Sequence, residues 1–328
     1  MGAALTGRGV AAHARLSIIL GKGGVGRTTI ACAFAVDRAV AGERVLLVSI
    51  VMDEDPTARI QHEAAGVDTG GRLQLLSIDT RDLVDDIVRR VTRMGTMADF
   101  IIRSPSYESL VDIVPGVHEM ALFHELEKRT RGEFDRIVLD APATGHGLHF
   151  LAAPEKTSRI LAGPLKDRAE RLRSWLQDPA TTDVVIVTLA EEMPVRETIE
   201  LASTLRRQGF PLDNIVVNRW LPRVFVDEGP HAVLDAVSKH RLADPSWVTA
   251  MRLVSAQHSE AESHLAELRA LDAKLAIVPL IPDSSHRLLK VAEAMKDFVP
   301  NGGSGDLAPR SRRPEDGSGG AEPRREGL

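Results

Sequence analysis

The chain has 328 residues, 43% of them hydrophobic, and a formal net charge of −5 at pH 7. This length allows one large α/β domain or two smaller ones, and the hydrophobic content is ordinary for a globular protein. The slightly acidic balance gives no electrostatic footprint for nucleic acid or for an anionic membrane, so we expect neither as a partner. The apolar runs are too short to span a bilayer, and the single cysteine, Cys32, allows no disulfide framework within one chain. We therefore expect a cytoplasmic protein without an integral membrane segment.

A glycine-rich stretch follows the first expected strand, 16–20, and precedes a helical pattern. Strand, loop and helix in this order are the setting of a phosphate-binding loop, whose glycines turn backbone N–H groups towards phosphate oxygens. The usual pattern is G-x-x-x-x-G-K-[ST]; Gly21, Gly26 and Thr28 fit it, and Arg27 stands at the lysine position. Thr28 stands where such loops place a hydroxyl on Mg²⁺. The residues expected to bind a nucleotide through this loop are Gly21, Gly23, Gly24, Val25, Gly26, Thr28 and Thr29.

The following segments alternate between apolar strands and amphipathic helices. Runs rich in Val, Leu and Ile predict strands at 44–50 and 73–78, and apolar residues at helical spacing follow from residue 83. Continuous apolar strands of this kind belong to a parallel sheet that helices cover on both faces. The first of these two strands runs into an acidic stretch that contains Asp53 and Asp55.

The strand expected at 136–140 ends in an aspartate, Asp140. An aspartate at a strand end beside a phosphate loop holds Mg²⁺ through water, so Thr28 and Asp140 are the expected metal residues. The next loop contains His146, for which we favour a role in the loop over metal binding.

The second half of the chain predicts three more strands, at 183–188, 215–219 and 275–280. Pro194 is expected to start a helix after the first of them, and residues 230–272 are expected to form one or two long polar helices. Residues 300–328 are rich in Gly, Ser, Pro, Arg and Glu, which predicts a disordered tail, and residues 1–14 are predicted to be a flexible arm.

The glycine-rich loop and the segment that begins at Asp140 resemble motifs of the arsenite-pump and tail-anchored-protein-targeting ATPases. This family has a deviant phosphate loop and is related to MinD and ParA. The run from Lys22 to Thr29 is similar to that loop, and the run from Asp140 to His146 is similar to the family's second switch element. The resemblance spans roughly residues 15–299. It implies an α/β P-loop NTPase fold, with a mostly parallel twisted sheet, helices on both faces and a small helical insertion. It also implies Mg²⁺-dependent hydrolysis of ATP to ADP and phosphate by a nucleotide-switched homodimer.

The resemblance implies roles for the charged residues. Lys22 corresponds to a signature lysine that reaches into the partner's active site, and Arg27 replaces the lysine on the β- and γ-phosphates. Arginine keeps the positive charge, although its planar head is bulkier than an ammonium group. An aspartate of the first switch orients the attacking water; Asp53 or Asp55 could do so, and we prefer Asp55 because it precedes a proline.

The resemblance also implies a second switch loop and a base site. Asn218 stands where the family reads the amino group of adenine, and Pro279 and Leu280 stand where a loop covers the base. The residues that match the second switch after Asp140 are Pro142, Thr144, Gly145 and His146.

Helical insertions are expected near 80–130 and 148–181, where the family builds a subdomain that binds client proteins. We therefore expect a protein client or partner, which the sequence does not identify. Arsenite binding needs several cysteines and the family's structural zinc needs a C-x-x-C pair, so we expect neither an arsenite site nor zinc. Two alternatives stay open: a nucleotide-gated binding module with little or no hydrolysis, which Arg27 favours, and a MinD- or ParA-like positioning ATPase.

Overall fold

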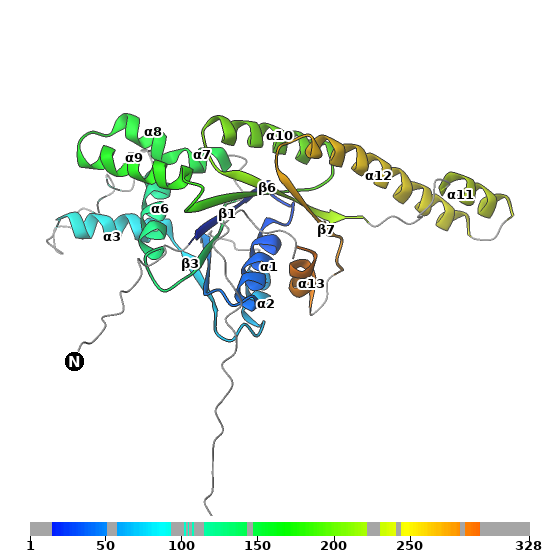
Figure 1. Cartoon of the computed structure of the whole chain (residues 1–328), viewed down its shortest axis with the longest axis horizontal. Helices are drawn as coiled ribbons and strands as arrows, with labels where there is room; N and C mark the ends of the chain where they lie inside the picture. Colours follow the sequence, from blue (N-terminus) through cyan, green and yellow to red (C-terminus); the bar gives the residue numbers. More distant parts are fainter. Residues whose placement is uncertain are drawn as a thin grey trace, which may run out of the picture.

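The computed structural model describes residues 15–50, 58–92, 102, 104, 107, 115–142, 147–221, 230–240, 244–282 and 286–295. Its centre is one sheet of seven parallel strands in the order β3-β2-β4-β1-β5-β6-β7 (Figure 1). This sheet confirms the expected α/β fold. The strands are β1 (Arg15–Gly21), β2 (Val45–Ile50), β3 (Leu73–Ile78), β4 (Arg136–Asp140), β5 (Thr182–Thr188), β6 (Leu212–Trp220) and β7 (Lys274–Pro279).

Helices cover both faces of the sheet (Figure 1). One face packs against α1, α2 and α13, and the other packs against α6, α7, α9 and α10. The helices in the described part of the chain are α1 (Arg27–Val40), α2 (Ala58–Ala65), α3 (Thr80–Thr92), α6 (Val117–Arg129), α7 (Gly147–Leu151), α8 (Ala153–Ile160), α9 (Pro164–Gln177), α10 (Glu192–Arg207), α11 (Pro230–Lys239), α12 (Pro245–Arg269) and α13 (Arg287–Ala294).

The central strand β1 positions the glycine-rich loop. Its five inner residues are buried, because neighbouring strands flank it on both sides and helices cover both of its faces. In the register of the sheet, Ile19 lies beside Asp140 of β4, and Gly21 lies beside Val187 of β5. Parallel strands all end at the same edge of a sheet, where α/β proteins bind their ligands. The sheet therefore brings the glycine-rich loop and Asp140 to one edge.

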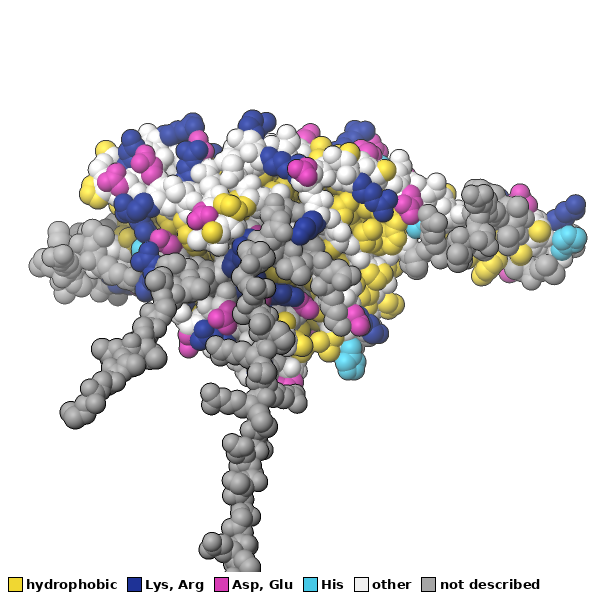
Figure 2. All heavy atoms as spheres, in the orientation of Figure 1, with side chains coloured by type: hydrophobic (Ala, Val, Ile, Leu, Met, Phe, Trp, Pro, Cys, Tyr) yellow, Lys and Arg dark blue, Asp and Glu magenta, His cyan; other side chains and the backbone are white. Residues whose placement is uncertain are grey.

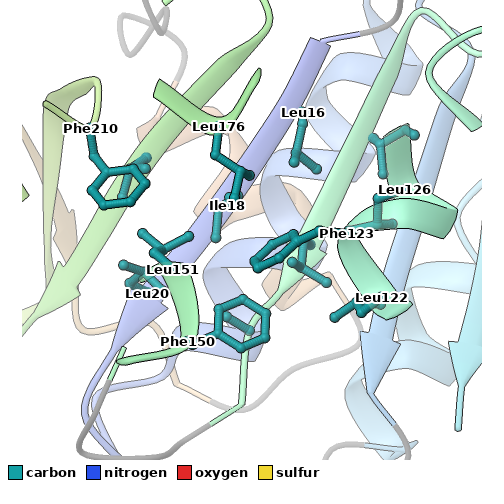
Figure 3. Close-up of a cluster of buried hydrophobic side chains, with 14 of the residues drawn as sticks. Leu16, Ile18, Leu20, Leu122, Phe123, Leu126, Phe150, Leu151, Leu176 and Phe210 are labelled. Carbon is teal, nitrogen blue, oxygen red and sulfur yellow. The ribbon is translucent and has the colours of Figure 1, made fainter. Parts of the chain in front are cut away.

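Aromatic and aliphatic side chains fill the space between the sheet and the helices α6, α7 and α9. Phe123 of α6 packs against Phe150 of α7, with ring centroids 4.9 Å apart and an interplanar angle of 58°. Figure 3 shows these two rings beside the side chains that β1 presents to the same face, Leu16, Ile18 and Leu20. This packing fixes α7 close to the end of β1.

The helices α3, α6, α8 and α9 gather beside one end of the sheet, and α11 and α12 extend beyond the other (Figure 1). The helices α11 and α12 lie within residues 230–272, where one or two long helices were expected. The helix after β5 begins at Glu192, two residues before Pro194, which corrects the predicted start. Residues 1–14 and 300–328 lie outside the described residues, and the domain boundaries stay a prediction.

Candidate functional site

The loop between β1 and α1 has a geometry that favours glycine, as Gly21 and Gly26 illustrate. A Cβ atom on Gly21 would lie 2.7 Å from the carbonyl oxygen of Val187. Gly26, which precedes α1, has a φ of 86°, in the left-handed region that side chains disfavour. In the described structure no side chain caps this helix, so the positive end of its dipole and its first N–H groups are available to an anion.

Three side chains of the loop and of β4 meet at the edge of the sheet. The Thr28 hydroxyl donates to Oδ2 of Asp140 at 2.6 Å, and Nε of Arg27 donates to Oδ1 of Asp140 at 2.8 Å. Nη1 of Arg27 also donates to the carbonyl oxygen of Gly21 at 3.2 Å. The Arg27 and Asp140 side chains are only 10% and 7% exposed. Both oxygens of the Asp140 carboxylate are therefore engaged by donors of the chain itself.

The donor set at Asp140 suits a hard divalent cation. A hydroxyl oxygen and a carboxylate oxygen lie 2.6 Å apart, and Mg²⁺ prefers oxygen ligands of this kind together with water and phosphate. Among the described residues, no group of three or more His, Cys, Asp and Glu side chains could hold a metal ion. The oxygen donors of Thr28 and Asp140 fit a Mg²⁺ ion, for which a nucleotide and water would supply the other ligands.

Cys32 lies on α1, one turn after the loop, and is 1% exposed. Burial raises the pKa of its thiol well above the usual range, and the negative charges of Asp140 and Glu63 raise it further. A thiol in this state is a poor nucleophile, which favours a structural role for Cys32.

Lys22 forms an ion pair with Glu197 of α10, across 175 positions of sequence. Both side chains are nearly half exposed, at 47% and 41%. The pair lies at a cavity of about 440 Å³ between the glycine-rich loop, β5, α7 and α10, which Thr188 and Leu148 also line. The sequence contains no local signal for this pairing.

Asn218 at the end of β6 contacts the glycine-rich loop. Its Nδ2 donates to the carbonyl oxygen of Val25 at 2.8 Å, and both residues are buried. Pro279 ends β7, and the backbone N–H of Leu280 donates to the carbonyl oxygen of Trp220 at 2.8 Å. Asn218 and the Pro279–Leu280 turn therefore lie on two adjacent strand ends, β6 and β7.

The structure brings together Lys22, the loop glycines, Arg27, Thr28, Asp140 and Asn218. Pro142 is half-buried just beyond Asp140. The expected residues of the two switches are not all described: those outside the described residues are Asp53, Asp55, Thr144, Gly145 and His146. Sequence reasoning did not identify the two acceptors that the structure adds, Glu197 for Lys22 and the Val25 carbonyl for Asn218, because both contacts join distant segments.

The chain is similar in sequence to known ATPases. Residues 14–167 and 162–232 match the family of anion-transporting ATPases. The ATPase BagA of Mycobacterium tuberculosis is 30% identical over 224 residues, which are 63% of this chain and 66% of BagA. The ATPase GET3 of Kluyveromyces lactis is 26% identical over 259 residues, 64% of this chain and 72% of GET3. The ATPase asna-1 of Caenorhabditis elegans is 24% identical over 321 residues, 82% of this chain and 91% of asna-1. No helix within the described ranges is long and apolar enough to cross a membrane.

Proposed function

Because the chain belongs to the family of anion-transporting ATPases, we propose that it hydrolyses ATP with Mg²⁺ as a nucleotide-switched homodimer. The observation that carries this proposal is the meeting of Arg27, Thr28 and Asp140 beside the glycine-rich loop. A cation, a hydroxyl and a carboxylate at the N-terminus of a helix are the groups that phosphoryl transfer to water needs. The named ATPase relatives support the same reaction.

The residues of the site divide the work between binding and positioning. The backbone N–H groups from Gly23 to Thr29 bind the phosphates, and Thr28 and Asp140 would hold Mg²⁺, Asp140 through water. Bound Mg²⁺ neutralises charge that develops on the phosphate oxygens. Arg27 contributes a second positive charge, and Asp55, outside the described residues, orients the attacking water; Asp53 is the alternative.

The proposed dimer depends on Lys22. Its half-exposed ammonium lies at the mouth of the site and needs to exchange only Glu197 for an acceptor in a second copy of the chain. An exposed ion pair contributes little free energy, so breaking the pair between Lys22 and Glu197 costs little. ATP binding would favour the closed dimer and hydrolysis would reopen it, which gives a switch that a protein client could read.

The test is steady-state phosphate release with Mg-ATP for the wild type, for Lys22→Ala and for a control, Lys166→Ala. Lys166 is a similarly exposed lysine on α9, so its removal changes the net charge equally. We expect turnover per subunit to rise with protein concentration in the wild type and the control, and to be lost in Lys22→Ala. Turnover that is independent of concentration and of Lys22 would contradict the dimeric mechanism.

The ion pair between Arg27 and Asp140 favours a second candidate, a nucleotide-gated binding module with little hydrolysis. In that case the Arg27 guanidinium stays paired with Asp140 and does not stabilise the negative charge that develops on the phosphate. Tight binding of Mg-ATP without phosphate release in any variant would support this second function over the first.

A further inference from the structure

The amide of Asn218 contacts the backbone of the glycine-rich loop, 193 positions away in sequence. Nδ2 donates to the carbonyl oxygen of Val25 at 2.8 Å, Asn218 is 7% exposed and Val25 is 2% exposed. A buried hydrogen bond of this kind holds its two partners in one arrangement, because breaking it leaves a buried donor and acceptor unsatisfied. The end of β6 therefore holds the loop in place.

The next residue of the loop, Gly26, also lies against the Asn218 side chain. A Cβ atom on Gly26 would lie 2.3 Å from Nδ2 of Asn218, and the backbone there has a φ of 86°. No side chain at this position could coexist with the amide where it lies. The turn that enters α1 and the Asn218 side chain are thus fitted to each other.

We propose that Asn218 is a positioning residue for the phosphate half of the nucleotide site, acting through Val25 and Gly26, in addition to any contact with the base. This inference rests on the proposed ATP site. The loop directs its N–H groups towards phosphate, and the amide of Asn218 fixes the peptide that connects Val25 to Gly26. Loss of the amide therefore loosens the phosphate cradle itself.

The same hydrogen bond determines which bases Asn218 accepts. Donation to the Val25 carbonyl orients the amide and leaves its Oδ1 as the acceptor for a ligand. The 6-amino group of adenine can donate to this oxygen, whereas the 6-oxo group of guanine or hypoxanthine would place two acceptors together. Occupation of the base site by adenine then reinforces the loop, and base and phosphate binding become coupled.

Magnesium tripolyphosphate has no base, so its binding reports the positioning role of Asn218 separately from any contact between Asn218 and the base. Its affinity is measured by calorimetry for the wild type, for Asn218→Ala and for Asn214→Ala. Asn214 is a matched control on the same strand: it is fully buried, and within the described structure its amide has no hydrogen-bond partner. We expect Asn218→Ala to weaken tripolyphosphate roughly tenfold, the factor typical of one buried hydrogen bond, and Asn214→Ala to leave it unchanged.

Two results would overturn the inference. One is an Asn218→Ala variant that loses affinity for Mg-ATP but keeps that for tripolyphosphate, which would confine Asn218 to the base. The other is an equal loss in both variants, which would mark a general effect on folding. If the wild type binds neither Mg-ATP nor tripolyphosphate, the proposed ATP site itself fails, so the two failures are distinguishable.

A second measurement uses the wild type alone and stays informative if Asn218→Ala does not fold. Tripolyphosphate affinity is measured with saturating adenosine and with saturating inosine. We expect adenosine to raise the affinity several-fold and inosine to leave it unchanged, because only adenosine carries a 6-amino group to donate to Oδ1 of Asn218. Equal effects of both nucleosides would contradict the coupling.

Discussion

The guanidinium Nε of Arg27 lies 2.8 Å from Oδ1 of Asp140, so a buried ion pair joins the glycine-rich loop to the end of β4. The Thr28 hydroxyl occupies the second oxygen of the same carboxylate. The group proposed to contact phosphate and the group proposed to order the Mg²⁺ shell are thus paired with each other. Phosphate and Mg²⁺ would therefore compete with this ion pair for the same two side chains.

Arg27→Lys is expected to raise Mg-ATP turnover by roughly tenfold. Arginine holds Asp140 and the Gly21 carbonyl with two different nitrogens, whereas lysine has one nitrogen on a flexible stem and loses about one charged hydrogen bond, ~1.5 kcal/mol. The measurement is phosphate release at saturating Mg-ATP, together with the melting temperature without nucleotide. A variant that is slower than the wild type would show that the bidentate head of arginine is needed for catalysis.

Asp140→Asn is expected to abolish Mg²⁺-dependent turnover and to destabilise the protein by about 3 kcal/mol. Removing one partner of a buried ion pair leaves the other charge uncompensated, which costs roughly 3–5 kcal/mol, and the isosteric amide offsets part of this. Urea unfolding gives the stability and phosphate release gives the activity. Unchanged stability would mean that the Arg27–Asp140 pair contributes nothing to the free energy of unfolding of the nucleotide-free protein.

Asp135→Asn is the matched exposed control and carries its own pH prediction. Asp135 pairs with Arg44 at 3.1 Å on the surface, and a hydrogen bond from Arg44 holds the pKa of Asp135 below its usual value. The carboxylate therefore stabilises the fold above the ordinary aspartate pKa of about 4, and this contribution is lost as the pH falls through the lowered value. We expect the wild type to be slightly more stable than the variant at pH 7 and the difference to vanish in acid.

Glu197→Gln is expected to increase turnover two- to fivefold at low protein concentration, where dimerisation limits the rate. The variant removes the intrachain partner of Lys22, and an exposed ion pair of this kind is worth roughly 0.2–1 kcal/mol. Glu200→Gln serves as the control because it removes the same charge from the same helix and lines the same cavity. An equal increase in both variants would indicate a general charge effect instead.

Cys32 is expected to react slowly with thiol reagents in the native protein, and more slowly still with Mg-ATP bound. The thiol is 1% exposed and its pKa is raised by burial, so reaction needs a local opening of α1 and formation of the thiolate. The rate of labelling should rise with pH as the thiolate fraction grows. Labelling as fast as that of the unfolded chain would contradict the burial of this helix.

Much of the fold could be predicted from the sequence because its strands are continuous apolar runs. The strand 73–78 has the predicted ends, and 136–140 ends at Asp140 as expected, since a charged residue interrupts the apolar run there. The start of α10 was predicted wrongly because a proline fits several positions of a first helical turn, and here the helix begins two residues before Pro194.

The sequence by itself determined the glycine-rich loop, its Thr28 hydroxyl and the aspartate that ends β4. These features depend on residues within a few positions of one another, where glycine conformation and apolar spacing act. Only the tertiary structure decided that Arg27 pairs with Asp140, Lys22 with Glu197 and Asn218 with Val25, which lie 113, 175 and 193 positions apart. The physical reason is the strand order: β4, β1, β5 and β6 are neighbours in the sheet, and their ends meet at one edge although the sequence separates them.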